Sequence, residues 1–448
     1  MRFWAACASL LALLGSVPGH AQDEPLRLMR EPGSFTDVID AADDLDPYDL
    51  NVRLGFRRSR ERATLQRQST GMVPSFTDVA DYERIRNVLE LGVDFGIYKD
   101  VALYARLPLV LVDTRSLSPS GAAGPVMAFP GDMDAPLFSL PFDSPDRSGL
   151  EHLAVGLAFS PMNQGRHRWQ PTWTMLFEGR FSIGELIEPC AAGTGCSDGV
   201  SDGTHAVRFE NRLSRRYRYV ELYGGLGFHF AWAGRAEDRF APGGQLSGYV
   251  HRRPPTRGFL TAGIDIVPWE ERMKWQRLSI DLRATGTYVS EGRDYSLLYD
   301  ALGTSQHRLL TTPNYEGIQP SIGPTYDLAE VPFNGLTDVQ AHGELSGTVA
   351  VEMQAARYVR FRFSTTLTYV SPHFVTYSDA CNTSADPTSD DDPRIGGIVD
   401  PATGNRVGGC SDGLIDPHYR AIIDAPGQRF RVDDILRTTF FVHATVQF

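Results

Sequence analysis

The sequence predicts an all-β protein, a closed antiparallel transmembrane β-barrel of about twelve strands with short turns at one end and long loops at the other. Three observations predict this fold. The 448-residue chain contains twelve segments in which apolar and polar residues alternate with period two. Short and long connections alternate strictly between these segments. The last segment, FFVHATVQF at 440–448, keeps the alternation up to its final residue, whereas chain ends are usually polar and loose.

The first residues are typical of an export signal. Arg2 supplies a positive n-region, residues 10–14 form a short apolar core, and Gly19 and Ala21 have the small-residue spacing of a cleavage site. We therefore expect a signal peptide over 1–21, a periplasmic N-terminal segment over 22–46 and the barrel over 47–448. The acidic 22–46 segment is expected to be a disordered leader, with a short periplasmic helix or a plug in the lumen as alternatives.

The membrane crossing is expected to be made by strands. After the signal, no apolar run reaches the about 20 residues that a spanning helix needs. The apolar faces of the alternating segments are almost free of charge, and aromatic residues such as Trp269 and Trp275 gather at strand ends, as in interfacial girdles. The expected strands lie at 48–57, 89–97, 101–111, 153–159, 173–181, 207–213, 220–232, 260–266, 278–288, 345–353, 359–369 and 440–448.

The connections distinguish a membrane barrel from a soluble sandwich, which shows the same alternation. The short ones lie at 98–100, 161–168, 214–219, 267–275 and 354–358, and the long ones at 58–83, 112–149, 183–204, 233–257, 290–336 and 371–429. Structureless connections beyond about 15 residues are uncommon in compact soluble domains. In lipid every backbone N–H and C=O needs a partner within the protein, so the last strand must pair with the first. The loops at 112–149 and 371–429 are candidates to fold inward and narrow the lumen.

The signal peptide, the amphipathic strands and a final strand ending in Phe448 together resemble the Gram-negative outer-membrane β-barrel superfamily. The resemblance implies a place in the outer membrane, contact with its lipids, and reading of the strand ending in Phe448 by the barrel assembly machinery. SGLEHLAVGLAF at 148–159 and NGLTDVQAHGEL at 334–345 resemble the Gly-Leu-x-Asp strand entries of barrels that take up aromatic or hydrophobic compounds. His152 stands where that pattern has an acid.

The polar faces of the strands predict a charged lumen. Isolated inward charges are costly, so opposite charges must neighbour one another. Two interpretations stay open: a narrow lumen packed with ion pairs, or an arginine-lined path for small solutes, with anions and aromatic compounds as candidates. Twelve strands lie between eight-stranded barrels filled by side chains and porins of 16–18 strands. The candidate lumen residues are Arg53, Arg84, Arg86, Glu90, Asp94, Arg106, Arg180, Arg208, Glu210, Arg212, Arg277, Asp281, Arg283, Glu344, Arg360 and Arg362.

Four cysteines follow the signal, all in expected long loops. An even number in an exported chain predicts disulfides, most simply Cys190–Cys196 and Cys381–Cys410. Metal binding is the alternative, but no histidine stands at ligand spacing beside either pair. The aspartate run at 390–392 suits Ca²⁺ by its oxygen ligands but lacks a regular ligand spacing, so a solvated cluster is expected. No metal or cofactor is expected.

The expected function is passive passage of small solutes through the lumen. A net charge of -12 argues against a nucleic-acid partner. One alternative is a surface, adhesion or structural barrel that acts through its extracellular loops, and another is a lipid-modifying enzyme. A lipid-cleaving histidine would face the bilayer, whereas the alternation directs the strand histidines inward, so we expect no enzyme and no catalytic residue. These histidines are His152, His229, His342 and His443.

Overall fold

The computed structural model describes residues 33–39, 41, 49–69, 74–195, 199–242, 248–311, 331–387, 395, 398–399, 406–407, 409–410 and 412–448. The predicted signal peptide at 1–21, Cys196 with its predicted disulfide, and the aspartate run at 390–392 lie outside the described residues. No helix in the described part of the chain has the length and apolar character that crossing a membrane requires.

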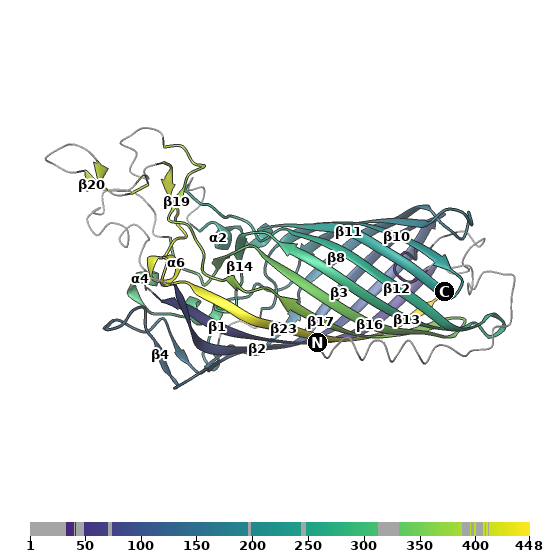
Figure 1. Cartoon of the computed structure of the whole chain (residues 1–448), viewed down its shortest axis with the longest axis horizontal. Helices are drawn as coiled ribbons and strands as arrows, with labels where there is room; N and C mark the ends of the chain where they lie inside the picture. The colour runs from purple at the N-terminus through teal and green to yellow at the C-terminus, as the bar shows by residue number, and fades with distance from the viewer. Residues whose placement is uncertain are drawn as a thin grey trace.

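Twelve long antiparallel strands form one closed sheet (Figure 1). They are β1 (Leu50–Ser69), β2 (Ser75–Tyr98), β3 (Val101–Pro119), β8 (His152–Met162), β9 (Thr172–Ser182), β10 (His205–Tyr217), β11 (Val220–Trp232), β12 (Arg257–Glu271), β13 (Gln276–Val289), β16 (His342–Ala356), β17 (Val359–Val370) and β23 (Phe430–Gln447). Each pairs with the long strand before and after it, and β1 pairs with β23. The predicted fold class and strand number are confirmed.

The two ends of the chain close the barrel. The register between β1 and β23 runs from Asn51 opposite Gln447 to Arg67 opposite Phe430. The backbone N–H of Phe448 donates to the carbonyl of Leu50 at 2.8 Å, and the carbonyl of Phe448 accepts from the N–H of Asp49 at 2.8 Å. The final residue is therefore part of the hydrogen-bonded ladder, as closure in lipid requires.

The outer wall of the barrel is apolar and exposed. Leu54, Leu260 and Leu345 are 52%, 65% and 62% exposed although they lie within regular, fully paired strands. A soluble monomer rarely exposes apolar surface on this scale, so hydrocarbon is the medium that this wall fits. Exposed aromatic residues mark both rims: Tyr98, Tyr217, Tyr219, Trp269 and Tyr358 at the turns, and Tyr288 and Tyr369 at the opposite ends of their strands.

The first three strands are longer than the alternation in the sequence predicts. The expected loop at 58–83 is wrong in its bounds, because β1 continues to Ser69 and β2 starts at Ser75. Within the expected loop at 112–149, β3 continues to Pro119. Beyond the lipid neither face of a strand has to be apolar, so the period-two signal fades while the backbone ladder continues.

The long loops build a cap over one end of the barrel, which is the extracellular end by the usual layout of such barrels (Figure 1). Its short elements are β4 (Gly124–Val126), β5 (Phe138–Leu140), β6 (Phe142–Asp143), β7 (Arg147–Leu150), η2 (Gly234–Ala236), α2 (Glu237–Phe240), β14 (Gly292–Asp294), α3 (Tyr299–Gly303), α4 (Arg308–Thr311), β15 (Thr337–Val339), β18 (His373–Phe374), β19 (Cys381–Asn382), β20 (Ile398–Val399), β21 (Arg406–Val407), β22 (Leu414–Ile415) and α6 (Ala421–Asp424). At the opposite end, η3 (Arg272–Lys274) forms part of a turn.

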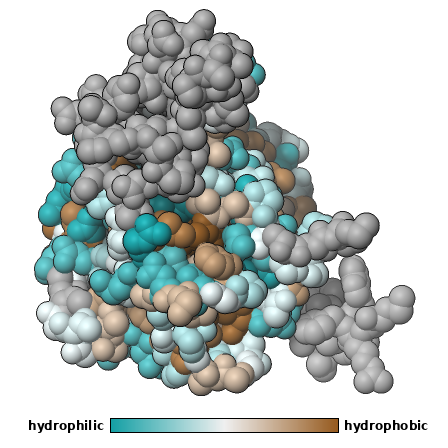
Figure 2. All heavy atoms as spheres, turned by 90° about the vertical axis from the view of Figure 1, so that its left-hand side faces the viewer, coloured by the Kyte–Doolittle hydropathy of each residue, from teal (hydrophilic) through white to brown (hydrophobic). Residues whose placement is uncertain are grey.

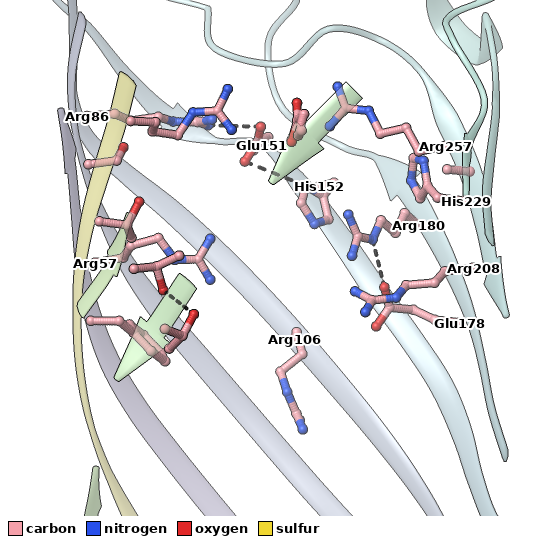
Figure 3. A pocket seen from close by; sticks show the side chains of 18 of the residues that line it. Arg57, Arg86, Arg106, Glu151, His152, Glu178, Arg180, Arg208, His229 and Arg257 are labelled. Atoms are coloured by element: carbon pink, nitrogen blue, oxygen red, sulfur yellow. Dashed lines mark hydrogen bonds and ion pairs between the residues drawn. The ribbon is translucent and has the colours of Figure 1, made fainter. Parts of the chain in front are cut away.

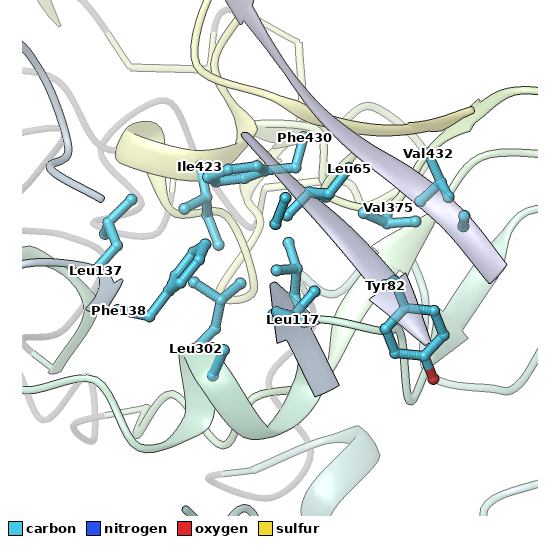
Figure 4. Packing of buried hydrophobic residues seen from close by; sticks show 14 of the residues in the cluster. Leu65, Tyr82, Leu117, Leu137, Phe138, Leu302, Val375, Ile423, Phe430 and Val432 are labelled. Carbon is cyan, nitrogen blue, oxygen red and sulfur yellow. The ribbon is translucent and has the colours of Figure 1, made fainter. Parts of the chain in front are cut away.

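The cap has a hydrophobic core of its own (Figure 4). Leu65 of β1 and Leu117 of β3 pack there with Phe138 of β5, Leu302 of α3 and Phe430 of β23. The extended ends of the first, third and last long strands thus anchor the cap to the barrel. Its outer surface is largely hydrophilic, with hydrophobic residues gathered near the centre of the end view (Figure 2). A disulfide between Cys381 and Cys410, as predicted, crosslinks the last loop.

A buried acid in α6 makes the cap sensitive to pH. Asp424 accepts hydrogen bonds from the backbone N–H groups of Arg420 (2.8 Å) and Ser378 (3.2 Å). Burial nevertheless raises the pKa of the Asp424 carboxyl to about 7. Desolvation disfavours the charged form, and at this site it outweighs the two hydrogen bonds.

Raising the pH from 6 to 8 is expected to destabilise the cap by on the order of 1 kcal/mol through Asp424. The folded carboxyl keeps its proton up to a pKa of about 7 and the unfolded one loses it near 3.8, so this stabilisation is lost as the pH rises through 7. Limited proteolysis of the cap in detergent at the two pH values measures the loss. The Asp424→Asn variant should show a pH slope smaller by this amount; a slope equal to that of the wild type would contradict the prediction.

Candidate functional site

A polar cavity of about 1170 Å³ occupies the interior of the barrel, and all twelve long strands contribute to its wall. Fourteen arginines and ten carboxylates of the described residues line it, an excess of four positive charges. The chain as a whole has a net charge of -12. The positive excess belongs to the lining alone, because three acids behind it pair with lining arginines: Glu90 with Arg57, Asp113 with Arg84 and Asp281 with Arg283.

Most of the candidate lumen residues line this cavity. They are Arg53, Arg84, Arg86, Asp94, Arg106, Arg180, Arg208, Glu210, Arg212, Arg283, Glu344, Arg360 and Arg362. The other three candidates form ion pairs with residues of the wall: Glu90 pairs with Arg57, Arg277 with Glu352 at 4.0 Å, and Asp281 with Arg283 at 2.9 Å.

Four further arginines line the cavity and are not among the candidate lumen residues: Arg57, Arg115, Arg257 and Arg437. The last three lie in parts of strands beyond the ends that the sequence predicts. Following the alternation further along β3, β12 and β23 would have found them.

Near the periplasmic turns the lumen charges are paired. Asp94 accepts hydrogen bonds from Arg106 at 2.5 Å and from Arg53 at 3.4 Å. Glu210 likewise accepts from Arg208 and Arg212 on its own strand, at 2.7 and 2.8 Å. This part of the lumen fits the interpretation of a narrow, ion-paired interior.

Nearer the cap, arginine side chains gather around one histidine (Figure 3). Arg180, Arg208 and Arg257 project into the cavity around His229, from the neighbouring strands β9, β10, β11 and β12. Arg180 forms an ion pair with Glu178, in which its Nε atom lies 2.7 Å from a carboxylate oxygen. Arg257 is exposed to the cavity and has no ion-pair partner among the described residues. The cluster therefore offers a guanidinium group that is available to a solute.

The described part of the N-terminal segment, 33–39, lies inside the barrel rather than in the periplasm. Phe35 is 6% exposed and stacks on Tyr223 with ring centroids 4.3 Å apart. The guanidinium carbons of Arg212 and Arg283 lie 4.9 and 5.0 Å from the centre of the Phe35 ring. Such cation–π contacts become stronger when the ring is removed from water.

Hydrogen bonds hold the same segment on both sides of Phe35. The hydroxyls of Thr36 and Ser214 lie 2.6 Å apart, and the Thr174 hydroxyl donates to the Thr36 carbonyl at 2.7 Å. Arg362 donates to the Ser34 hydroxyl at 2.9 Å.

Val38 and Ile39 pack against Ala102 and Tyr104 of β3, on the wall opposite β13 and β17. The segment 33–39 therefore crosses the lumen from one wall to the other. We call it the lumen plug.

The extracellular loops also contribute to the cavity. Residues from the loops at 183–204, 233–257, 290–336 and 371–429 line its wall near the cap, among them Ile187, Pro255, Tyr295 and Val375. Of the described residues in the expected loop at 112–149, Arg115 lines the cavity, and it belongs to the extended part of β3.

The strand histidines lie in the lumen. His152, His229, His342 and His443 all line the cavity and do not face the lipid. Within the described ranges, no group of three or more histidine, cysteine, aspartate or glutamate side chains is arranged to hold a metal ion.

No model of a known protein family matches the chain, and no curated protein is significantly similar to it. Solved structures with a similar fold include an outer membrane channel from Pseudomonas putida F1, with 9% identity over 93% of this chain and 99% of that chain and a TM-score of 0.40. The β domain of the Bordetella autotransporter BrkA has 10% identity over 88% and 99%, with a TM-score of 0.32. A FadL homologue from Pseudomonas aeruginosa has 10% identity over 91% and 93%, with a TM-score of 0.34. The closed sheet, the apolar outer wall and the charged interior together give this chain the fold of an outer-membrane β-barrel.

Proposed function

We propose that the protein is a channel for small anionic solutes and that the lumen plug closes its periplasmic end. The observation that carries the proposal is Arg257, an arginine exposed to the cavity without an ion-pair partner among the described residues, in a lining where arginines outnumber carboxylates. Rings of charged side chains select ions of opposite sign in a pore, and low-dielectric walls strengthen their field.

Arg257 is the residue best placed to meet a solute. It lies in the cavity without an ion-pair partner in the described part of the chain, beside His229 and close to Arg180 (Figure 3). A guanidinium binds carboxylates and phosphates through two parallel hydrogen bonds, whereas the paired arginines near the turns already use their donors on acids. The cluster around Arg257 therefore acts as the entry site for anions.

Aromatic anions are the solutes that the lumen fits best. The ring of Phe35 already rests between Tyr223 and the guanidinium groups of Arg212 and Arg283. An aromatic carboxylate that displaced the plug would find the same ring face and the same cations. We expect benzoate to permeate or block the channel at lower concentration than acetate, a difference that planar-bilayer recordings measure.

Replacing Arg257 with glutamate is expected to lower the chloride-to-potassium permeability ratio at least about fivefold. The change removes one positive charge and adds a negative one beside the path, and each is worth on the order of 0.5–1 kcal/mol in a water-filled lumen. The reversal potential of purified protein in a planar bilayer with a KCl gradient measures the ratio.

Arg218→Glu is the matched control for this experiment, because Arg218 lies in the turn between β10 and β11, outside the cavity wall. The same shift in both variants would contradict the role of Arg257. A lack of conductance and of liposome swelling, even after deletion of the plug, would exclude the channel.

The cap favours a second candidate function, binding at the cell surface. Long loops that served only to line a pore would not need a core such as the one around Leu117, Phe138 and Phe430. Deletion of 384–409, in the last loop, tests this candidate. Loss of surface binding with unchanged permeability would support it, and loss of permeability alone would favour the channel.

A further inference from the structure

Three arginines on β1 face outward, away from the lumen. Along this strand Val52, Leu54 and Phe56 are 40%, 52% and 42% exposed on the outer wall. The alternation continues on the same face with Arg58, Arg60 and Arg62, all of which are exposed. The residue before each of them, Arg57, Ser59 and Glu61 respectively, lines the cavity instead. We call Arg58, Arg60 and Arg62 the outer arginine row.

The outer arginine row lies at the extracellular edge of the membrane. A strand rises about 3.3 Å per residue and tilts by about 35–45° in such barrels, so the eight residues from Leu50 to Arg58 climb about 20 Å. The apolar band of these barrels is about 25 Å tall. Arg58 therefore lies near the upper border of the hydrocarbon, and Arg60 and Arg62 lie at the level of the lipid headgroups. On β13 and β17 the aromatic residues Tyr288 and Tyr369 mark this rim.

The row forms one side of a groove on the outer wall. In the register of β1 with β23, Arg58 lies opposite Phe440, Arg60 opposite Thr438 and Arg62 opposite Leu436. These six residues line a groove of about 360 Å³. On one side of the groove β1 supplies the three arginines. On the other side β23 supplies the Thr438 hydroxyl between the apolar side chains of Leu436 and Phe440. Phe440 is 54% exposed at the end of the groove nearer the membrane interior.

The charge of this groove is not balanced by the described part of the protein. Glu83 of β2 pairs with Arg60 and lies 3.7 Å from Arg62. Arg58 has no ion-pair partner among the described residues. Three positive charges thus meet one acid at a place where a guanidinium is in contact with lipid. An arginine there is unfavourable next to hydrocarbon and favourable next to an anionic headgroup.

We propose that the outer arginine row binds the phosphorylated headgroup of a glycolipid in the outer leaflet. The guanidinium groups would take the phosphate oxygens through paired hydrogen bonds, and the Thr438 hydroxyl would donate a further one. An acyl chain would run down the wall over Phe440 and Val442, which are both exposed. The apolar end of the groove and its height in the membrane select the lipid over free phosphate. The site is independent of the lumen and of the proposed channel.

The test uses the full-length protein with Arg58, Arg60 and Arg62 all replaced by glutamine. Folding is checked by the mobility shift of heated and unheated protein on a gel. Native mass spectrometry in detergent then measures binding of rough-form lipopolysaccharide. We expect the triple variant to bind it at least about tenfold more weakly than the wild type. The wild type should lose a similar factor when the lipid has been chemically dephosphorylated.

The matched control replaces Arg215, Arg218 and Arg357 with glutamine, which removes the same charge at the periplasmic end, and it should bind the lipid as the wild type does. If the triple variant fails to fold, R58Q alone should weaken binding measurably. Three results would overturn the proposal: equal binding by wild type and row variants, equal binding of the dephosphorylated lipid, or displacement of the lipid by inorganic phosphate at comparable concentration.

Discussion

Replacing Arg147 with methionine is expected to destabilise the extracellular cap by about 3–5 kcal/mol. Arg147 is fully buried, and it donates to both carboxylate oxygens of Asp300 in α3, at 2.6 and 3.0 Å. Asp300 also accepts from the Ser144 hydroxyl at 2.8 Å and from the backbone N–H of Cys190 at 3.1 Å. One carboxylate thus joins three loops of the cap. Methionine has a similar length and no charge, so it leaves the Asp300 carboxyl group buried without its main partner.

Urea-dependent proteolysis of the cap, with the barrel folded in detergent, measures this loss. Arg308→Met is the matched control, because Arg308 belongs to α4 of the same cap and its exposed side chain lies 4.0 Å from Asp134. Exposed ion pairs contribute at most about 1 kcal/mol, so the control should change little. Equal effects of the two substitutions would show that the buried pair does not hold the cap together.

Replacing Phe35 with alanine is expected to release the lumen plug and to raise the conductance of the channel. Phe35 loses its stacking on Tyr223 and its contacts with Arg212 and Arg283. Truncation of a buried phenylalanine typically costs about 3–5 kcal/mol, which corresponds to a factor of more than about 100 in the population of the displaced plug. The hydrogen bonds of Ser34 and Thr36 and the packing of Val38 and Ile39 remain in the variant, so the expected effect comes from the ring of Phe35 alone.

Single-channel recordings of wild type and variant in a planar bilayer measure the effect. A cysteine introduced at Ser34 should also react faster with a thiol reagent in the Phe35→Ala background. The control is Phe129→Ala, because Phe129 lies in the cap and is 43% exposed. Unchanged conductance and unchanged thiol reactivity in the Phe35 variant would mean that the segment does not close the lumen.

Much of the barrel follows from local patterns in the sequence. The alternation of Leu50, Val52 and Leu54 with polar neighbours indicates which side of β1 contacts lipid. A sheet in lipid must be closed, because every backbone N–H and C=O needs a partner within the protein. The same alternation places Arg53, Arg106 and Arg208 in the cavity wall. It does not reach Arg115, Arg257 or Arg437, because their strand segments lie close to or above the membrane edge, where the apolar half of the pattern ends.

The sequence by itself therefore determined the strands, their order, their lipid-facing sides and the pairing of the terminal phenylalanine strand with the first one, because period-two alternation and backbone closure are properties of each segment and of the solvent around it. The contacts between segments that are far apart in the sequence were decided only by the tertiary structure. Arg147 and Asp300 are 153 residues apart, and their pairing depends on how separate loops fold over one another. The plug's position depends on the shape of the finished lumen, since the sequence around Phe35 does not encode Tyr223 or Arg283 as its partners.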